Sequence, residues 1–545
     1  MPGFWGDRMN RALIPTVVFW TIIATAAPVA TEPSLFETSK TATPESPIDI
    51  LVFREFSKKG IRPLFCSDAV FLRRAYLDVI GTLPTALEAR AFLEDASINK
   101  RKALIDRLLE RDEYADYWAM KWSDLLRIKA EFPVNLWPNA AQAYHHWVRA
   151  SIRDNKPYDR FVREMLTSNG SNFRVGPVNF YRAIQARTPE GIASAVALTF
   201  MGARTDAWPT NTLADMAVFF SQISYKPTRE WKEEVVFWDP DKGSAPAAAS
   251  TNAPAAPPRP KPASAVLPDK TRVKLPPDRD PRELFADWLI SPKNPWFTAA
   301  ICNRMWSWLQ GRGIIHEPDD IRPNNPPSNP ALLAYLQKEF VRSGYDMKHV
   351  MRLILNSRVY QLSSVVPASK VKPGEALFAY YPIRRLDAEV LIDAINKVTG
   401  TTDLYTSAIP EPFTFIPANK PAIALPDGSI TSSFLELFGR PARATGMESE
   451  RVNKPLPPQC MHLLNSSHIQ RKLEEGPVMK MLLNPNRKQP EIVEELYLTI
   501  LSRFPAPAEV EKMDAYVKTG VVKGREAGID LAWALLNSDE FLYRH

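Results

Sequence analysis

The chain has 545 residues, 45% of them hydrophobic and 10% aromatic, which is typical of a folded protein long enough to bury more than one core. Its formal net charge is +7, but the basic residues are interleaved with acidic ones, as in RKALIDRLLERDE at 101–113. Such interleaving is typical of solvated helix faces, whereas a nucleic-acid partner would require a one-sided basic patch. The sequence therefore predicts a globular protein that binds no nucleic acid.

The N-terminus has the pattern of a secretory signal peptide. Arg8 and Arg11 precede the apolar run ALIPTVVFWTIIATAA at 12–27, and Ala24-Thr25-Ala26 offers small residues for cleavage. No later segment reaches about 18 consecutive apolar residues, so no membrane span is expected after cleavage. We therefore predict a signal peptide over 1–26 and a periplasmic or extracellular mature protein, and whether the signal is cleaved or kept as an anchor stays open.

The first half of the mature chain, 45–238, is expected to be a helical domain. Its apolar residues recur at helical spacing over 104–109 and again along EYADYWAMKWSDLLRIK at 113–129. The segment WKEEVVFWD near 230–238 instead has the β-branched and aromatic content of a short strand or hairpin arm. Between two apolar runs lies the polar segment ARTDAWPTNT at 203–212, referred to below as the hinge, which should interrupt the helices.

Residues 239–281 are expected to be a linker. They are rich in Pro, Ala and Lys and contain no aromatic residue. They therefore offer little apolar surface to offset the entropy cost of ordering.

The second half, 282–545, is expected to be another helical domain. RELFADWL at 282–289 opens it, Asn329 and Asp346 are placed to cap two further helices, and Gly400 to end a third. Residues 401–430 should form a loop, and the C-terminal segment should present Leu531, Leu535, Ser538 and Leu542 on one stripe. The fold class is therefore mainly α: two helical halves, a few short strands and long irregular connectors.

Motifs for the common catalytic and cofactor sites are absent: the sequence has no Walker A motif, no G-x-S-x-G, no H-E-x-x-H and no C-x-x-C-H. The three cysteines, Cys66, Cys302 and Cys460, lie far apart. An exported protein could pair two of them, and the sequence does not say which. Cys302 and Cys460 lie in apolar helical segments, which favours their being small buried residues.

Three clusters of charged residues remain as candidates. GRGIIHEPDDIRP at 311–323 could form a weak oxygen-rich metal site, although the carboxylates could equally cap a turn and pair with arginines. YYPIRRLDAEVL at 380–391 is best interpreted as an ion-pair network at a helix start. GMESERVNKPLPPQCMHLLNSSH at 446–468 could line a pocket, with Glu448 and Glu450 on one side of an extended segment. The candidate metal residues are His316, Glu317, Asp319 and Asp320, and the candidate pocket residues are Glu448, Glu450, Arg451, His462 and Asn465.

Long blocks of the chain resemble a pair of bacterial domains of unknown function, numbered 1549 and 1553, which are abundant in planctomycete-type bacteria and often accompany a c-type cytochrome domain. The first domain is matched by FLRRAYLDVIGTLPT, RLLERDEYADYWAMKWSDLLR, NKPYDRFVREMLTSNGS and NFYRA between 71 and 183. The second is matched by blocks at 286–315, 326–364, 384–395, 434–443, 461–467, 495–509 and 533–545. The resemblance implies no established reaction.

The chain departs from this family pattern at two places. The resemblance implies a Cys/His segment like C-x-x-C-H-x-H-P after "FMGAR", where this chain has TDAWPTNT at 205–212, and C-E-C-E-R downstream, where it has MESER at 447–451. Thiolates and imidazoles are what bind zinc or haem iron, so their joint loss removes such a site. Two losses in one chain also suggest that the two segments meet in space in relatives that keep these residues.

The sequence therefore favours a metal-free binding or scaffold protein of the cell envelope, with no cofactor and an unknown protein or polysaccharide partner. One alternative is an extracellular hydrolase acting on carbohydrate or a related polymer through carboxylates such as Glu448, Glu450 or Asp320. A second alternative is a redox-associated protein, which would need a cofactor that the chain lacks the residues to ligate.

Overall fold

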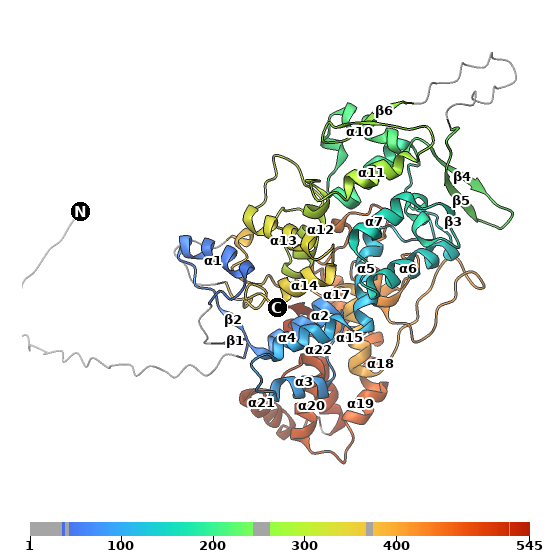
Figure 1. Ribbon diagram of the computed structural model, residues 1–545. Helices are drawn as coiled ribbons and strands as arrows, with labels where there is room; N and C mark the ends of the chain where they lie inside the picture. The colour runs from blue at the N-terminus through green and yellow to red at the C-terminus, as the bar shows by residue number, and fades with distance from the viewer. Residues whose placement is uncertain (1–34, 39–42, 243–261, 367–373, 523) are drawn as a thin grey trace, which may run out of the picture. The chain divides into compact units, whose positions relative to one another are not determined.

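A computed structural model describes residues 35–38, 43–242, 262–366, 374–522 and 524–545 (Figure 1). The expected signal peptide and its cleavage site lie outside these residues, as does the central part of the expected linker, 243–261. Helices dominate and strands are few and short, which confirms the predicted mainly α class. Among the described residues, no helix combines the length and the apolar character that a membrane span requires.

The first half of the chain builds a run of short and medium helices, several of them started by local capping. Ser46 and Asp49 form a capping box at the first helix, and Gly60, in a left-handed conformation, ends it. Thr85 and Glu88 form another capping box. The helices are α1 Pro47–Lys59, α2 Asp68–Val79, α3 Ala86–Glu94, α4 Lys100–Leu109, α5 Asp112–Leu125, α6 Pro138–Arg153, α7 Tyr158–Thr167 and α8 Asn179–Arg182.

The hinge interrupts the helices as expected. Helix α9 (Pro189–Val196) continues into a π-helical turn, Ala197–Met201, which ends at Gly202 in the left-handed region. The carbonyl of Gly202 accepts the amide of Ile321 at 2.8 Å, which ties the start of the hinge to the 317–321 loop. A 3-10 turn, Thr205–Ala207, then leads through Pro209 into α10 (Thr210–Ala217).

The strands are short and antiparallel. The segment expected to be a strand forms β5 (Glu234–Trp238), which lies between β3 (Gly170–Ser171) and β4 (Ile223–Pro227). The described end of the expected linker forms a hairpin of β6 (Ser264–Val266) and β7 (Arg272–Lys274). Ala265 and Leu267 are buried, and β6 contacts α10, so the few apolar residues in this stretch suffice to order it. The outermost pairs are β1 (Glu37–Thr38) with β2 (Phe65–Cys66) and β8 (Arg384–Arg385) with β9 (Tyr543–Arg544).

In the second half the expected caps form. The Asn329 side chain accepts the amide of Leu332, Asp346 accepts that of His349, and Gly400 ends its helix with φ 71°. The helices are α11 Pro281–Leu289, α12 Phe297–Gln310, α13 Pro330–Arg342, α14 Met347–Leu355, α15 Ala388–Thr399, α16 Ser433–Leu437, α17 Pro457–Asn465, α18 Ser467–Glu475, α19 Pro477–Leu482, α20 Gln489–Leu501, α21 Pro507–Lys518, α22 Arg525–Leu536 and α23 Asp539–Leu542. The prediction of a single C-terminal stripe is wrong, because the segment forms two helices: α22 ends at Leu536, and Ser538 caps α23.

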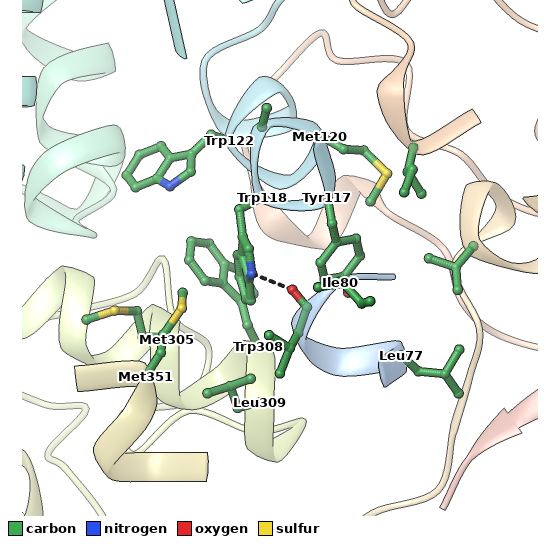
Figure 2. Packing of buried hydrophobic residues seen from close by; sticks show 14 of the residues in the cluster. Leu77, Ile80, Tyr117, Trp118, Met120, Trp122, Met305, Trp308, Leu309 and Met351 are labelled. Atoms are coloured by element: carbon green, nitrogen blue, oxygen red, sulfur yellow. Dashed lines mark hydrogen bonds between the residues drawn. The ribbon is translucent and has the colours of Figure 1, made fainter. Parts of the chain in front are cut away.

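The core contains side chains from both halves of the chain. Trp118 on α5 lies beside Trp308 on α12, with ring centroids 5.3 Å apart, and donates its indole N–H to the carbonyl of Val79 at 3.0 Å (Figure 2). Arg73 on α2 is buried and donates to the carbonyls of Ile500 and Phe541, both at 2.8 Å. Burying aromatic rings together is strongly favourable, so the two halves stabilise each other.

Candidate functional site

The hinge meets the 444–447 loop across a cavity of about 450 Å³. From the hinge side it is lined by Arg204, Thr205 and Asp206, from α9 by Ser194, and from the π-helical turn after α9 by Leu198. Ala444, Thr445 and Met447 line it from the loop side, and Arg127, from the end of α5, completes it. Hydroxyl, amide and guanidinium groups and the carboxylate of Asp206 thus line a cavity that also has an apolar wall. We refer to this space as the hinge cavity.

Glu450 shapes the loop side of the hinge cavity. Its carboxylate accepts the backbone amides of Ala444 at 2.9 Å and Thr445 at 3.0 Å, and the Thr445 hydroxyl at 2.7 Å. Three donors on one carboxylate close the chain between 444 and 450 into a tight loop. Glu450 therefore fixes the loop and is not a free acid or base.

Arg127 is the most unusual residue of the hinge cavity. It has a left-handed backbone, φ 57°, and is only 6% exposed. Its Nε donates to the carbonyl of Thr445 at 3.0 Å, while its Nη1 is buried without a hydrogen-bond partner. Burial lowers the pKa of Arg127 to about 10, so it remains charged at neutral pH. Gly446 makes this position possible, because a Cβ there would fall 2.6 Å from the guanidinium carbon.

Behind the cavity lies a network of buried ion pairs around the start of α15. Asp124 pairs with Arg443 at 2.9 Å and with Arg451 at 2.7 Å, and Arg451 also reaches Glu389 at 2.6 Å. Burial alone would raise the pKa of Glu389, but Arg451 and Arg440 lower it to about 2. This network links α5, α15 and the 439–451 segment.

Asp387 extends this network to the C-terminus. It pairs with Lys121 at 2.9 Å and with Arg544 at 3.0 Å. Burial would raise the pKa of Asp387, but these cations and Arg451 hold it well below its usual range. The ion-pair interpretation of the 384–389 cluster is confirmed for Arg384, Asp387 and Glu389. Arg385 instead contacts the carbonyl of Phe438 and the side chain of Gln459.

Glu448 lines a separate cavity of about 180 Å³, together with Lys121, Arg384, Asp387 and Arg451. Burial, together with the nearby charge of Asp319, raises the pKa of Glu448 to about 7. Its Oε2 is buried without a hydrogen-bond partner. Glu448 is therefore the one residue of the predicted pocket with the properties of a general acid or base near neutral pH.

The predicted pocket divides into two places. Glu448, Glu450 and Arg451 lie together, but the extended conformation expected for Glu448 and Glu450 is wrong. Glu448–Glu450 form a 3-10 turn, which directs the two carboxylates about 120° apart around the turn. His462 lies on α17 in another cavity, of about 620 Å³, and Asn465 is exposed at the end of that helix. The helix start at Pro457 carries both residues away from the glutamates.

His462 belongs to a chain of hydrogen bonds that the sequence did not suggest. Its Nε2 lies 3.3 Å from Nδ1 of His468, whose Nε2 lies 2.7 Å from Asp403. Burial and the neighbouring His468 lower the pKa of His462. Residues 403 and 468 are 65 positions apart, and nothing in the local sequence marks Asp403 as their partner.

The three carboxylates of the candidate metal site at 316–320 pair with three different arginines. Asp319 pairs with Arg304 at 2.7 Å, Asp320 with Arg322 at 3.1 Å and Glu317 with Arg204 at 2.8 Å. Over the described parts of the chain, no group of three or more His, Cys, Asp or Glu side chains is placed to hold a metal ion. The alternative that these carboxylates pair with arginines is therefore the one that the structure supports.

All three cysteines are free. Cys66 and Cys302 are buried, and burial strongly raises the pKa of the Cys302 thiol. The expectation that Cys460 is buried is wrong, because α17 presents it to solvent.

Two family models match the chain. Residues 47–212 match the model described as a protein of unknown function (DUF1549), PSCyt2, and residues 281–517 match the model of DUF1553, PSD1. The chain is a paired DUF1549–DUF1553 protein. No curated protein and no solved structure is detectably similar to it.

In this DUF1549–DUF1553 protein, the two places where the resemblance implies Cys and His residues lie on the same cavity. Thr205 and Asp206 come from the first place and Met447 from the second, and all three line the hinge cavity. In this chain the two segments therefore meet in space. None of the residues that line the hinge cavity is a Cys or a His.

The sequence did not reveal Arg127 as part of the site. It lies in DLLRIK, just after an ordinary amphipathic helix, and that it pairs with no carboxylate among the described residues appears only in three dimensions. The glycine at 446 is the one local signal, because a glycine beside a charged cluster often marks close approach of the backbone to a side chain or ligand.

Proposed function

We propose that this chain is a metal-free binding protein of the cell envelope, which takes a segment of an envelope polysaccharide into the hinge cavity. The observation that carries the proposal is that the two segments expected to hold sulfur and imidazole ligands instead surround a cavity lined by hydroxyl, amide, guanidinium, carboxylate and apolar groups. Its volume of about 450 Å³ lies within the range of small-molecule sites, about 300–1,000 Å³.

The lining suits a sugar better than a folded protein partner. The Ser194 and Thr205 hydroxyls bond to each other and the Gln185 amide donates to the carbonyl of Ala444, which leaves these groups further acceptor sites for a ligand. Ile184 and Leu198 form an apolar wall. Small-ligand sites combine a mostly apolar lining with a few polar groups that fix orientation. The N-terminal signal pattern at 1–26 supports placing the protein outside the cytoplasm.

A hydrolase acting on the same class of polymer is the second candidate, and the raised pKa of Glu448 favours it. Its cavity of about 180 Å³ is, however, smaller than the usual range for ligand sites. Glycoside hydrolysis also requires a second carboxyl group. Asp319, the neighbour that raises the pKa of Glu448, is held by Arg304 at 2.7 Å. These features make binding the better-supported function.

The experiment is calorimetry on the mature protein from its native host, titrated with oligosaccharides released from that host's own envelope. Thr205→Trp fills the hinge cavity, and Ala207→Trp, an exposed residue of the same hinge that does not line it, is the matched control. Binding should persist in Ala207→Trp and be lost in Thr205→Trp. No binding by the wild type, or equal binding by both variants, contradicts the proposal. Release of new reducing ends that stops in Glu448→Gln would favour the hydrolase.

A further inference from the structure

Arg127 differs from the other deeply buried arginines of the described chain in how it is neutralised. Arg304 pairs with Asp319 at 2.7 Å, and Arg443 pairs with Asp124 at 2.9 Å. Arg74 has no acidic partner but donates to three carbonyls, those of His545, Tyr360 and Leu362. Arg127 donates to one carbonyl, and among the described residues no carboxylate pairs with it.

A buried guanidinium with an unused N–H group is costly, because it has lost its water without gaining a full set of partners. Arg74, Arg304 and Arg443 also have buried N–H groups without a partner, so what distinguishes Arg127 is that it lines a cavity and has only one hydrogen-bond partner. Arg127 has a left-handed backbone conformation, and the glycine at 446 leaves room for its guanidinium. Two independent backbone features therefore serve this one placement.

The charges of Glu450 and Asp319 favour the charged form of Arg127, but neither carboxylate pairs with it directly. Glu450 is the nearest acidic residue along the loop, but three donors already hold its carboxylate. Asp319 is held by Arg304 and by the amide of Glu448. Of the residues that line the cavity, Arg204 adds a second guanidinium, paired with Glu317 at 2.8 Å, and Asp206 is exposed to solvent.

We infer that the hinge cavity binds an oxyanion, with Arg127 as its buried anchor, so that its ligand is an acidic rather than a neutral sugar. Guanidinium groups bind carboxylate, sulfate and phosphate through paired N–H groups, and the guanidinium of Arg127, which lines the cavity and forms no ion pair among the described residues, offers such a group. Thr205 and Ser194, whose hydroxyls bond to each other, line the same cavity and can accept hydrogen bonds from the remainder of the ligand. This inference rests on the proposed function and specifies the chemistry of its ligand.

The test measures the thermal shift and the calorimetric affinity of the full mature chain at fixed ionic strength. The probes are glucuronate, glucose 6-sulfate and glucose 6-phosphate, with glucose as the neutral control. We expect at least one acidic probe to raise the melting temperature where glucose does not, and the three probes distinguish carboxylate, sulfate and phosphate. Arg127→Gln should lower the affinity for that probe at least about tenfold, as expected for loss of a charged hydrogen bond. Arg187→Gln, a half-buried arginine that does not line the cavity, should not.

The comparison of the acidic probes with glucose on the wild-type protein tests the inference even if Arg127→Gln fails to fold. Equal responses to glucose and to all three acidic probes overturn it, as does an unchanged affinity in a folded Arg127→Gln protein. Binding of neutral envelope oligosaccharides without a preference for acidic ones would overturn this inference and leave the proposed function standing. Binding of an acidic probe without binding of envelope oligosaccharides would support this inference and contradict the proposed function.

Discussion

Gly446 and Arg127 lie so close together that a Cβ on Gly446 would fall 2.6 Å from the guanidinium carbon of Arg127. The glycine also has φ 75°, in the left-handed region. A side chain at position 446 would therefore displace the guanidinium and its hydrogen bond to Thr445, in addition to straining the backbone.

We predict that Gly446→Ala destabilises the protein more than Gly344→Ala does. Gly344 has nearly the same φ, 72°, but an added Cβ there would meet nothing within 4 Å. Gly344→Ala should cost about 1 kcal/mol of unfolding free energy, from backbone strain alone. Gly446→Ala should cost about 1–2 kcal/mol more, since it also disrupts a charged hydrogen bond. Denaturant unfolding of the two variants measures this difference, and equal losses would show that Arg127 is not held by the close approach of Gly446.

We predict that the C-terminal residues contribute to the free energy of unfolding. Arg544 is buried and pairs with Asp387 at 3.0 Å, and it also donates to the hydroxyl of Tyr117 at 3.0 Å. Arg544→Met should cost about 3 kcal/mol, because it leaves Asp387 with fewer cations in a buried site. The control, Arg54→Met on the exposed face of α1, should change stability by no more than about 0.5 kcal/mol. Similar small effects in both variants would contradict the role given to the C-terminus.

Glu448 predicts a specific pH dependence of stability. Its pKa is raised from the usual 4.5 to about 7 in the folded protein, so the carboxyl group favours folding while it is protonated. That contribution is complete below pH 4.5 and is lost as the pH rises through 7. Glu448→Gln cannot ionise, so its stability relative to the wild type should rise by up to about 3 kcal/mol across this interval.

Unfolding at pH 4.5, 6 and 8 measures this effect, with Glu436→Gln, at an exposed glutamate, as the control. The difference between Glu436→Gln and the wild type should stay constant with pH. A constant difference for Glu448→Gln as well would mean that Glu448 ionises normally, and it would remove the observation that favours a hydrolase.

Features encoded by neighbouring residues could be predicted from the sequence. Asn329, Asp346 and Gly400 act on the helices that they adjoin, so their roles are evident within four residues of sequence. The hairpin at 264–274 was missed because only a few apolar residues support it and the composition of the whole stretch resembles that of a linker.

Features that depend on distant partners could not be predicted. Asp387 and Arg544 are 157 positions apart, and Arg127 meets Thr445 across 318 positions. The candidate pocket failed for the same reason: residues 446–468 are close along the chain, but helix α17 separates His462 from Glu448. The meeting of the hinge with the 447–451 segment could be foreseen only because both depart from one family pattern.

Proteolysis should cut the chain between 243 and 261 and leave two fragments that stay together. Elastase is the suitable enzyme, because this stretch is rich in Ala, and its basic residues, Arg259 and Lys261, each precede a proline. The fragments should co-elute in size exclusion under native conditions, since Trp118 packs against Trp308 and Arg73 donates to Ile500 across the cut. First cuts within 60–235, or fragments that separate without denaturant, would contradict this organisation.

The most direct test of the account is the haem and metal content of the protein purified from its native host without a histidine tag. A c-type haem needs C-x-x-C-H and a structural zinc needs about four close ligands, whereas the hinge cavity is lined by neither Cys nor His. We predict no Soret absorbance and no stoichiometric zinc by mass spectrometry. A Soret band, or about one zinc per chain that survives mild chelation, would contradict the metal-free binding site and favour a redox or metal-dependent function.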